Sequence, residues 1–414
     1  MRFSTEVRSG EFPAVFTRFE ALIGSSLWRR RVVKIREDIR GNPYLREWLR
    51  EENRVAFALN AFSTGRDASG AVPSVQVQDA HQYEAVAFVV QTMSFLASVD
   101  APIANSFVGR VRGAFANPAD FRALSLEMLT ATHLQRRGAV IQLPEDGTYD
   151  WLAERDGLVF EVECKSISGD KGRQVHFRES LDLCRLIKKE LGNLVNSVTD
   201  GLLLTVQLRA TVPSAYQVRR EIAKQSKQAT LMAQDLSSDV ARVTQAHFPR
   251  SELVLSGEPS DRDRVAKFMS QRYGQAHDHQ AVAHATPAGG LILIAIGSQL
   301  ADDMIGETMR ALEKAASDQL TGSRPGILCA KFEGLTADEL VDIAQAGNPP
   351  TALRVGVHNL WQSSAMESVS HLAFMADGEV AQRASGAWSR VGASYVFDNP
   401  KSPFKDDTRL QLFD

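Results

Sequence analysis

The sequence predicts an α/β protein with an all-α N-terminal domain, a mixed-sheet core flanked by helices and a β-rich C-terminal extension. Three patterns indicate this class: helical apolar spacing in the first third, alternating strands and helices after Gly138, and a mostly β tail. The chain has 414 residues, 44% of them hydrophobic and 23% charged, which is typical of a globular protein with two or three domains. We expect these domains at residues 1–117, 118–345 and 346–414.

The first third predicts helices over residues 13–38, 43–62 and 79–99. Asn117-Pro118 precedes a further helix over 119–137, and Gly138 occupies its C-cap position. The domain boundary is placed there because the pattern changes at this point from helices alone to helices mixed with strands.

After Gly138, helices followed by strands recur often enough to predict a mixed sheet. Helices are expected over 179–196, 215–228, 262–273 and 301–320. Strands are expected over 139–143, 149–153, 158–166, 202–211, 253–255, 281–285, 290–297 and 326–332. The tail over 354–397 is expected to add mostly β-structure.

Charge and cysteine content exclude several classes of protein. The formal net charge is −3, so any nucleic-acid binding must come from a local basic patch. The three cysteines are widely spaced and form no Cys-x-x-Cys pair, which favours a reducing cytoplasm. The apolar runs are far shorter than the roughly 20 residues that span a bilayer, so no membrane association is expected.

The most informative segment is the expected strand over 158–166. Its apolar positions alternate with a second set that contains Glu161, Glu163 and Lys165, so one face packs while the other gathers three charged side chains. Asp150 lies thirteen residues before Glu163, at the start of the preceding strand. Charges on a half-buried strand are unfavourable unless a function uses them.

Over roughly residues 119–230, this helix–strand–strand–strand–helix–strand order with Asp150 and a Glu163-x-Lys165 triplet resembles the PD-(D/E)xK phosphodiesterase superfamily. That superfamily includes many restriction endonucleases, Holliday-junction resolvases and RecB-type nucleases. The resemblance implies a restriction endonuclease-like core in which Asp150, Glu163, Lys165 and the helix residue Glu127 are catalytic. This sequence departs from the named signature because Tyr149, not proline, precedes the aspartate.

The resemblance implies Mg²⁺ or Mn²⁺ as the cofactor. Hard cations prefer oxygen ligands, and Asp150, Glu163, Glu127 and the backbone carbonyl of Cys164 could supply them. Such an ion would lower the pKa of a bound water and offset phosphate charge. Lys165 could orient or deprotonate that water, or could remain charged and stabilise the phosphorus centre.

Each of these residues also has a structural interpretation. Glu163 and Lys165 could form a surface ion pair, and Glu161 could be an auxiliary ligand or a solvated strand-end residue. Glu127 falls on the apolar side of its helix, so it needs a partner, which could be the metal site, an arginine or a backbone amide. His277-Asp278-His279 with His284 lacks a fourth ligand at a recognisable zinc spacing, which favours a solvated loop.

Basic residues concentrate after the triplet. The segment 165–227 holds twelve basic and six acidic residues, which predicts a phosphate-binding surface. The expected nucleic-acid contacts are Lys171, Arg173, Arg178, Lys188 and Lys189.

Together these patterns predict a cytoplasmic, metal-dependent endonuclease that acts on DNA, with RNA left open. Host defence or restriction is the expected setting, followed by DNA repair. The alternative is a nuclease-fold DNA-binding or scaffold subunit that is inactive without a partner. A double-strand cut usually needs two such sites, so a homodimer or a partner subunit of a defence system is also expected.

Overall fold

The structure is a computed structural model that describes residues 1–3, 10–68, 70, 72, 79–144, 148–256, 261–273, 280–345, 349–382, 388–390 and 392–411. The chain divides into two compact units. The main unit comprises Met1–Lys34, Glu52–Lys171 and Ile305–Asp414, and the inserted unit comprises Ile35–Glu51 and Gly172–Met304. The expected class, a mixed α/β protein, is confirmed, although this division runs through the expected segments and not at residues 117 and 345.

In the described part of the main unit, six strands form one mixed sheet in the order β1-β2-β3-β9-β10-β13. The strands are β1 (Val140–Gln142), β2 (Trp151–Arg155), β3 (Leu158–Ile167), β9 (Gly326–Thr336), β10 (Val369–Asp377) and β13 (Ala393–Asp398). β3, β9 and β10 run parallel, whereas β1, β2 and β13 add antiparallel edges. A small antiparallel ribbon joins β11 (Val380–Gln382) to β12 (Trp388–Arg390).

β3 pairs with β2 and β9 along its edges, and both of its faces are covered by packed side chains. Phe160, Val162 and Cys164 pack into the core of the N-terminal helices, while Val159 and Ile167 contact a second core on the other face. The expectation of one packed and one open face is therefore wrong at the centre of the strand. Glu161 and Glu163 are both buried there.

The N-terminal helices of the main unit share a hydrophobic core with its sheet. They are α1 (Phe12–Ile23), the first part of α2 (Ser26–Gly41), α4 (Arg54–Thr64), α5 (Ala80–Leu96), α6 (Ala101–Ala114) and α7 (Pro118–Arg136). The end of α2, the 3-10 turn η1 (Pro43–Leu45) and nearly all of α3 (Arg46–Glu52) belong to the inserted unit. The expected helix 13–38 is divided because Gly24 adopts φ +96° after α1, and α6 was not expected. Asn117 caps the N-terminus of α7, and its side chain accepts the Ala119 N–H.

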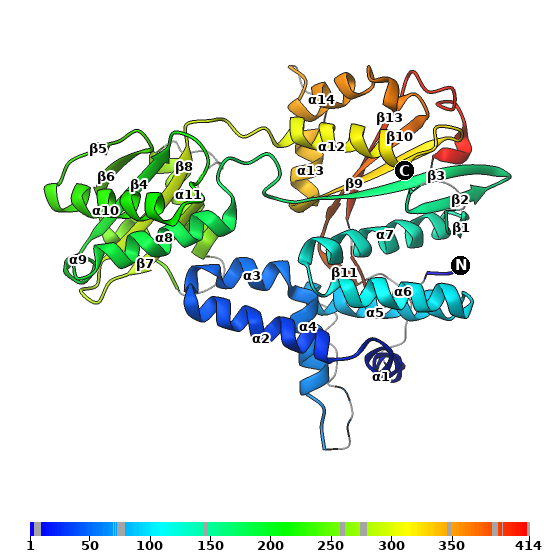
Figure 1. Ribbon diagram of the computed structural model, residues 1–414, viewed down its shortest axis with the longest axis horizontal. Helices are drawn as coiled ribbons and strands as arrows, with labels where there is room; N and C mark the ends of the chain where they lie inside the picture. The colour runs from blue at the N-terminus through cyan, green and yellow to red at the C-terminus, as the bar shows by residue number, and fades with distance from the viewer. Residues whose placement is uncertain are drawn as a thin grey trace. The chain divides into compact units, whose positions relative to one another are not determined.

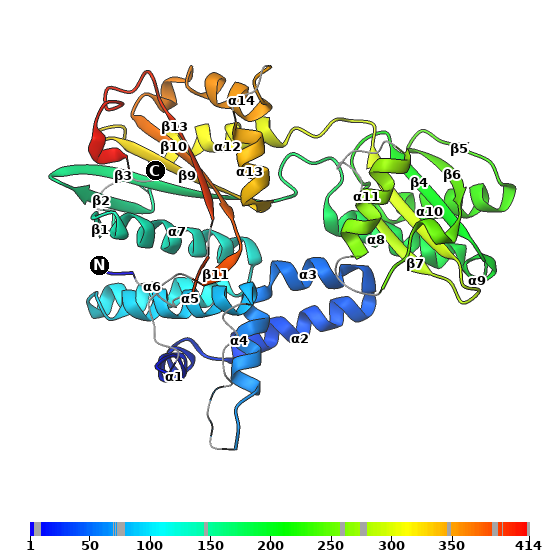
Figure 2. The same cartoon turned by 180° about the vertical axis from the view of Figure 1, so that it is seen from behind.

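Helices cover both faces of the main sheet (Figures 1 and 2). α7 packs against β3 and β1, and α12 (Met304–Gln319), α13 (Ala337–Ala344) and α14 (Ala352–Leu360) contribute to the core on the opposite face. α14 and the 3-10 turns η3 (Ser364–Met366) and η4 (Thr408–Leu410) show that the C-terminal segment is less purely β than expected.

The inserted unit interrupts the main unit between β3 and α12. Its described residues form a second sheet in the order β5-β6-β4-β8-β7. The elements are α8 (Phe177–Leu191), α9 (Leu194–Ser197), β4 (Gly201–Leu208), α10 (Tyr216–Met232), β5 (Leu236–Ser237), β6 (Ala241–Phe248), η2 (Arg250–Glu252), α11 (Asp261–Tyr273), β7 (Gln280–Ala285) and β8 (Leu291–Ser298). β6 was not expected, and the strand expected over 253–255 does not form.

The insertion changes which elements complete the core. The expected strand 202–211 is β4, which pairs with β6 and β8 and not with β3. The strand parallel to β3 is β9, and α12 precedes it, so the main unit has the order α7-β1-β2-β3-α12-β9.

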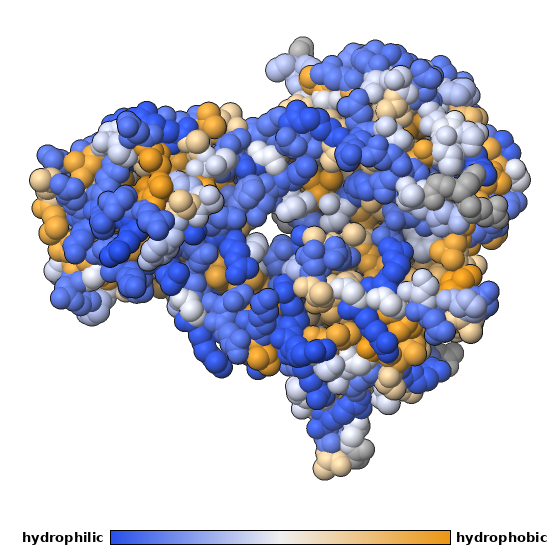
Figure 3. Space-filling model, in the orientation of Figure 1, coloured by the Kyte–Doolittle hydropathy of each residue, from blue (hydrophilic) through white to orange (hydrophobic). Residues whose placement is uncertain are grey.

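Both units present a mainly hydrophilic surface with scattered apolar side chains in the space-filling view (Figure 3). No helix in the described ranges combines the length and apolar character needed to cross a bilayer.

A prediction concerns Gly172, at the start of the inserted unit. Its φ is +73°, its carbonyl accepts the Asp303 N–H at 2.9 Å, and a Cβ placed there would overlap the Asp303 backbone. Gly289→Ala is the matched control, because Gly289 has φ +88° but open space around the added carbon. Both changes should cost about 1 kcal/mol for the left-handed conformation, and Gly172→Ala about 1–3 kcal/mol more for the overlap. Urea unfolding measures both; equal effects would contradict the contact.

Candidate functional site

Asp150 and Glu163 lie opposite each other on adjacent strands of the main unit. Trp151 pairs with Val162, so the next position places Asp150 beside Glu163. The Asp150 N–H donates to the Val162 carbonyl at 3.1 Å, and the Cys164 N–H donates to Asp150 Oδ2 at 2.8 Å. The β2–β3 register therefore fixes the Asp150 carboxylate against β3.

Lys165 forms an ion pair with Glu163 on the same strand. Lys165 Nζ lies 2.8 Å from Glu163 Oε1, and the two side chains are 30% and 1% exposed, respectively. Glu163 Oε2 is buried and has no hydrogen-bond partner within the part of the chain that the structure describes. Lys165 thus reaches solvent, while one oxygen of the Glu163 carboxylate lacks a hydrogen-bond donor among the described residues.

Glu127 on α7 joins Asp150, Glu163 and Lys165, and these four residues form the Asp150 cluster. Arg110 on α6 donates to both Glu127 oxygens, at 2.9 and 2.7 Å. Trp151 Nε1 donates to the Glu127 carbonyl at 3.0 Å, which ties this turn of α7 to the start of β2. Of the partners considered for Glu127, the structure supplies the arginine, and nothing in the sequence singles out Arg110 for this role.

Burial raises the pKa values of all three carboxyls, and repulsion from Asp150 adds to the shift of Glu127 and Glu163. Burial first and the neighbouring Asp150 second raise the pKa of Glu163 to about 8, although Lys165 opposes the shift. The same two causes raise the pKa of Glu127 to about 8 against the opposing effect of Arg110. Burial also raises the pKa of Asp150, while the Cys164 N–H, Lys165 and Arg110 lower it. The cluster therefore holds more carboxyl groups than its cations neutralise.

The donor set fits a divalent cation only in part. Among the described residues, no three His, Cys, Asp or Glu side chains are grouped as a metal site. Arg110 occupies both Glu127 oxygens, whereas Glu163 Oε2 remains without a partner beside Asp150. Because Mg²⁺ is usually held by one or two carboxylates together with waters and substrate phosphates, Asp150 and Glu163 are chemically suitable.

Two neighbouring residues have other partners. Glu161 is 0% exposed, accepts hydrogen bonds from Thr321 and pairs with Arg324 at 3.3 Å, so it is neither solvated nor in the Asp150 cluster. The Cys164 thiol is buried on the opposite face, in register with Cys329. Cys164 therefore faces Asp150 through its backbone alone.

The expected nucleic-acid contacts belong to both units. Lys171, in the main unit, lies 3.6 Å from Glu307. In the inserted unit, Arg173 lies over the Phe177 ring and Arg178 pairs with Asp38 at 3.6 Å.

The two lysines of α8 differ. Lys188 lies over the Tyr44 ring, and burial lowers its pKa, whereas Lys189 is exposed. His277, Asp278 and His279 lie outside the described residues, and burial lowers the pKa of His284.

Comparison of the chain with models of protein families, with curated proteins and with solved structures finds no match.

A prediction follows from the raised pKa of Glu163. A carboxyl whose pKa rises on folding stabilises the protein most below its unfolded value of about 4.3, and this contribution disappears as the pH passes about 8. In metal-free buffer, the unfolding free energy should therefore fall between pH 5 and 8.5, and Glu163→Gln should flatten this decline. Glu307→Gln is the control, because Arg310 lowers the pKa of that exposed residue. Denaturant unfolding at both pH values measures the effect; an unchanged slope in Glu163→Gln would refute it.

Proposed function

We propose that this chain is a Mg²⁺- or Mn²⁺-dependent nuclease that hydrolyses phosphodiester bonds in DNA. The observation that carries the proposal is the cluster on β2 and β3, where Asp150 lies opposite Glu163 and Lys165 bonds to Glu163. Acidic oxygens beside a partly exposed amine are the groups that metal-assisted phosphodiester hydrolysis requires.

The order of elements supports the finer assignment to a restriction endonuclease-like core. The order α7-β1-β2-β3-α12-β9, with β3 and β9 parallel, is the helix–strand–strand–strand–helix–strand arrangement of the PD-(D/E)xK superfamily. Asp150 directly precedes the second strand, the Glu163-x-Lys165 triplet lies on the third, and Glu127 lies on the preceding helix. The inserted unit then occupies the connection between the third strand and the second core helix.

The charge of the cluster supports a cation-dependent reaction. With the carboxyls ionised, Asp150, Glu163 and Glu127 outnumber Lys165 and Arg110 by one negative charge. Such a site repels a phosphodiester, whereas a divalent cation would reverse the sign of its charge. Substrate binding should therefore depend on the metal.

Each residue of the cluster would then have a distinct role in the reaction. Asp150, Glu163 and the Cys164 carbonyl would hold the ion, which would polarise the phosphate and lower the pKa of a bound water. Lys165 would place its ammonium beside that water or beside the phosphate oxygens. Arg110 would keep Glu127 oriented toward Asp150, so Arg110 is a positioning residue.

The biological setting remains part of the proposal. The resemblance to this superfamily implies DNA as the substrate, with RNA left open, and a role in host defence, restriction or repair. The three cysteines are buried free thiols, which suits a reducing cytoplasm. Two copies, or a partner subunit, would supply the paired sites that a double-strand cut requires.

A second candidate is a nuclease-fold DNA-binding or scaffold subunit. It is favoured by the fact that Glu127 and Lys165 already have partners within the chain, so part of the cluster is satisfied without substrate. α8 also presents the exposed basic residues Arg185 and Lys189. This candidate predicts DNA binding without cleavage.

The nuclease is tested by cleavage of supercoiled plasmid in Mg²⁺ or Mn²⁺. Asp150→Asn and Lys165→Met should each reduce the cleavage rate by about 10²–10⁴-fold, because each removes a group that acts on the water or the phosphate. Asp318→Asn and Lys314→Met are matched controls on α12, since both side chains are more than half exposed and pair with each other.

Chelation should abolish wild-type cleavage, and melting curves establish that each variant is folded. Cleavage that survives chelation or both site changes would refute the nuclease. Salt-sensitive DNA binding with no cleavage would establish the scaffold alternative.

A separate prediction tests DNA binding by the inserted unit. Charge reversal of Arg185 and Lys189 should weaken binding at low salt and reduce the slope of log K against log salt by about 0.9 per lost phosphate contact. Lys314→Glu with Arg310→Glu is the control, because these exposed cations lie on α12 of the main unit. Fluorescence anisotropy with a labelled duplex at several salt concentrations measures the slopes. An unchanged slope in the α8 variant would exclude this helix from the DNA interface.

A further inference from the structure

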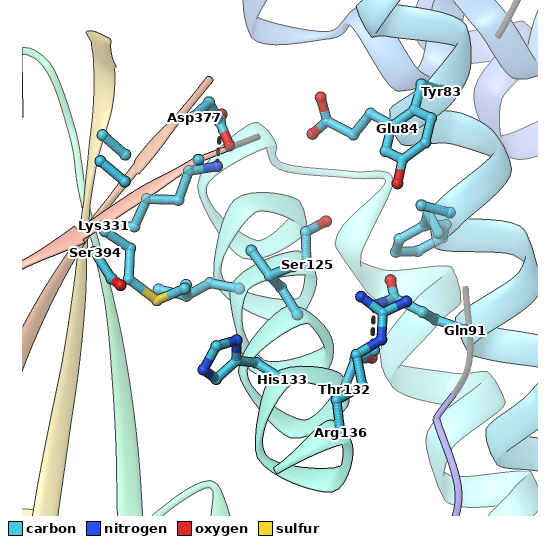
Figure 4. Close-up of a pocket in the computed structure, with 18 of the residues that line it drawn as sticks. Tyr83, Glu84, Gln91, Ser125, Thr132, His133, Arg136, Lys331, Asp377 and Ser394 are labelled. Atoms are coloured by element: carbon cyan, nitrogen blue, oxygen red, sulfur yellow. Dashed lines mark hydrogen bonds and ion pairs between the residues drawn. The ribbon is translucent and has the colours of Figure 1, made fainter. Parts of the chain in front are cut away.

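The main unit contains a cavity of about 570 Å³ that is separate from the Asp150 cluster. Its walls come from α5 and α7 and from strands β9, β10, β11 and β13 (Figure 4). The apolar part of the wall includes Phe88, Leu126, Leu129, Met375 and Ala393. Its volume lies within the range of about 300–1,000 Å³ that is usual for small-molecule sites.

A buried lysine projects from the middle of the sheet into this wall. Lys331 is 8% exposed, and its ammonium lies 2.8 Å from Asp377 Oδ2, as the dashed line in Figure 4 shows. Asp377 has a second cationic partner, because Arg54 Nη2 lies 3.4 Å from the same oxygen. Arg54 also pairs with Glu84, and Arg54 is not part of the cavity wall.

This arrangement determines the charge of a ligand that the cavity can accept. If a ligand anion attracts Lys331, Asp377 keeps Arg54 and is not left as an unpaired buried charge. A ligand cation would instead have to compete with Lys331 and Arg54 for Asp377, and with Arg54 for Glu84. Arg136 and His133 add basic groups to the α7 wall, which further favours an anion.

The remaining polar group that points to a ligand is Ser125. Its hydroxyl is buried and has no hydrogen-bond partner among the described residues, although Ser125 lines the cavity. Buried hydroxyls normally find a partner, so a polar group of a ligand could complete this site.

We propose that this cavity binds a small amphipathic anion whose apolar body packs against Phe88, Leu126 and Met375 and whose anionic group binds Lys331. The site is independent of the proposed nuclease activity, since none of its lining residues belongs to the Asp150 cluster. It nevertheless shares α7 with that cluster, and the pairing of β9 with β3 connects the two. α7 carries both Glu127 and a cavity wall, and Lys331 lies in register with Ser166, the residue after Lys165.

The proposal is tested by direct binding to the full-length protein without divalent ions. The fluorescent probe is anilinonaphthalene sulfonate, which combines an aromatic body with one anionic group. Saturable binding of one probe per chain is expected, and octanoate should displace it at least tenfold more effectively than octylammonium, which has the same chain length and the opposite charge. Equal displacement by the two would overturn the charge assignment.

Two variants locate the bound probe. Leu129→Trp should abolish binding by filling the cavity, and it is a mild change because Leu129 is 39% exposed. Val355→Trp is the matched control at a position 45% exposed that does not line the cavity. Lys331→Met should weaken octanoate about tenfold, in line with the loss of one charge-assisted hydrogen bond, while Asp377 keeps Arg54.

Other outcomes are equally decisive. Binding that persists in Leu129→Trp, or that disappears when Ala283→Trp fills the smaller cavity of about 310 Å³ in the inserted unit, would refute the site. If Lys331→Met does not fold, the Leu129→Trp result and the octanoate–octylammonium comparison still decide the question.

Discussion

The burial of charged groups at the centre of the main sheet is the constraint on which the rest of this unit depends. Glu163 is almost completely buried between β2 and β9, and Asp150 lies directly across from it. Carboxylates in such a place need donors, which are the Cys164 N–H for Asp150 and the Lys165 ammonium for Glu163. The Cys164 N–H reaches Asp150 only when the β2–β3 register is correct, so the register and the position of Asp150 in the cluster depend on each other.

Two lysines on neighbouring strands, the partly exposed Lys165 and the buried Lys331, pair with carboxylates in different ways. Lys165 on β3 and Lys331 on β9 lie on opposite faces of the sheet, because their partners in register, Ala330 and Ser166, alternate. Around Lys331, the described ion pairs join two cations to two carboxylates: Lys331 and Arg54 both pair with Asp377, and Arg54 also pairs with Glu84. Around Lys165 the carboxyls are in excess, and their pKa values rise. The excess of carboxyls around Lys165 means that the proposed cation, if it binds there, would stabilise the folded chain.

The inserted unit shows how a parallel connection can carry a second fold. A parallel pair such as β3 and β9 needs a crossover connection. The sheet fixes only the positions where this connection leaves and rejoins it, so the connection itself can be long. Here the chain leaves after Lys171 and returns at Ile305. Its contact between Gly172 and Asp303 brings the outgoing and returning segments together. A complete second sheet with its own helices fits in between.

The sequence by itself determined the local elements: the alternation around Phe160 predicted β3, Asn117-Pro118 and Gly138 bounded α7, and the helical position of Glu127 predicted its need for a partner. These depend on neighbouring residues, which a sequence displays directly. Only the tertiary structure decided that β9 and not residues 202–211 completes the sheet beside β3, and that Arg110 is the partner of Glu127. Strand pairing across an insertion and contacts between helices depend on packing between distant segments, which local periodicity does not encode.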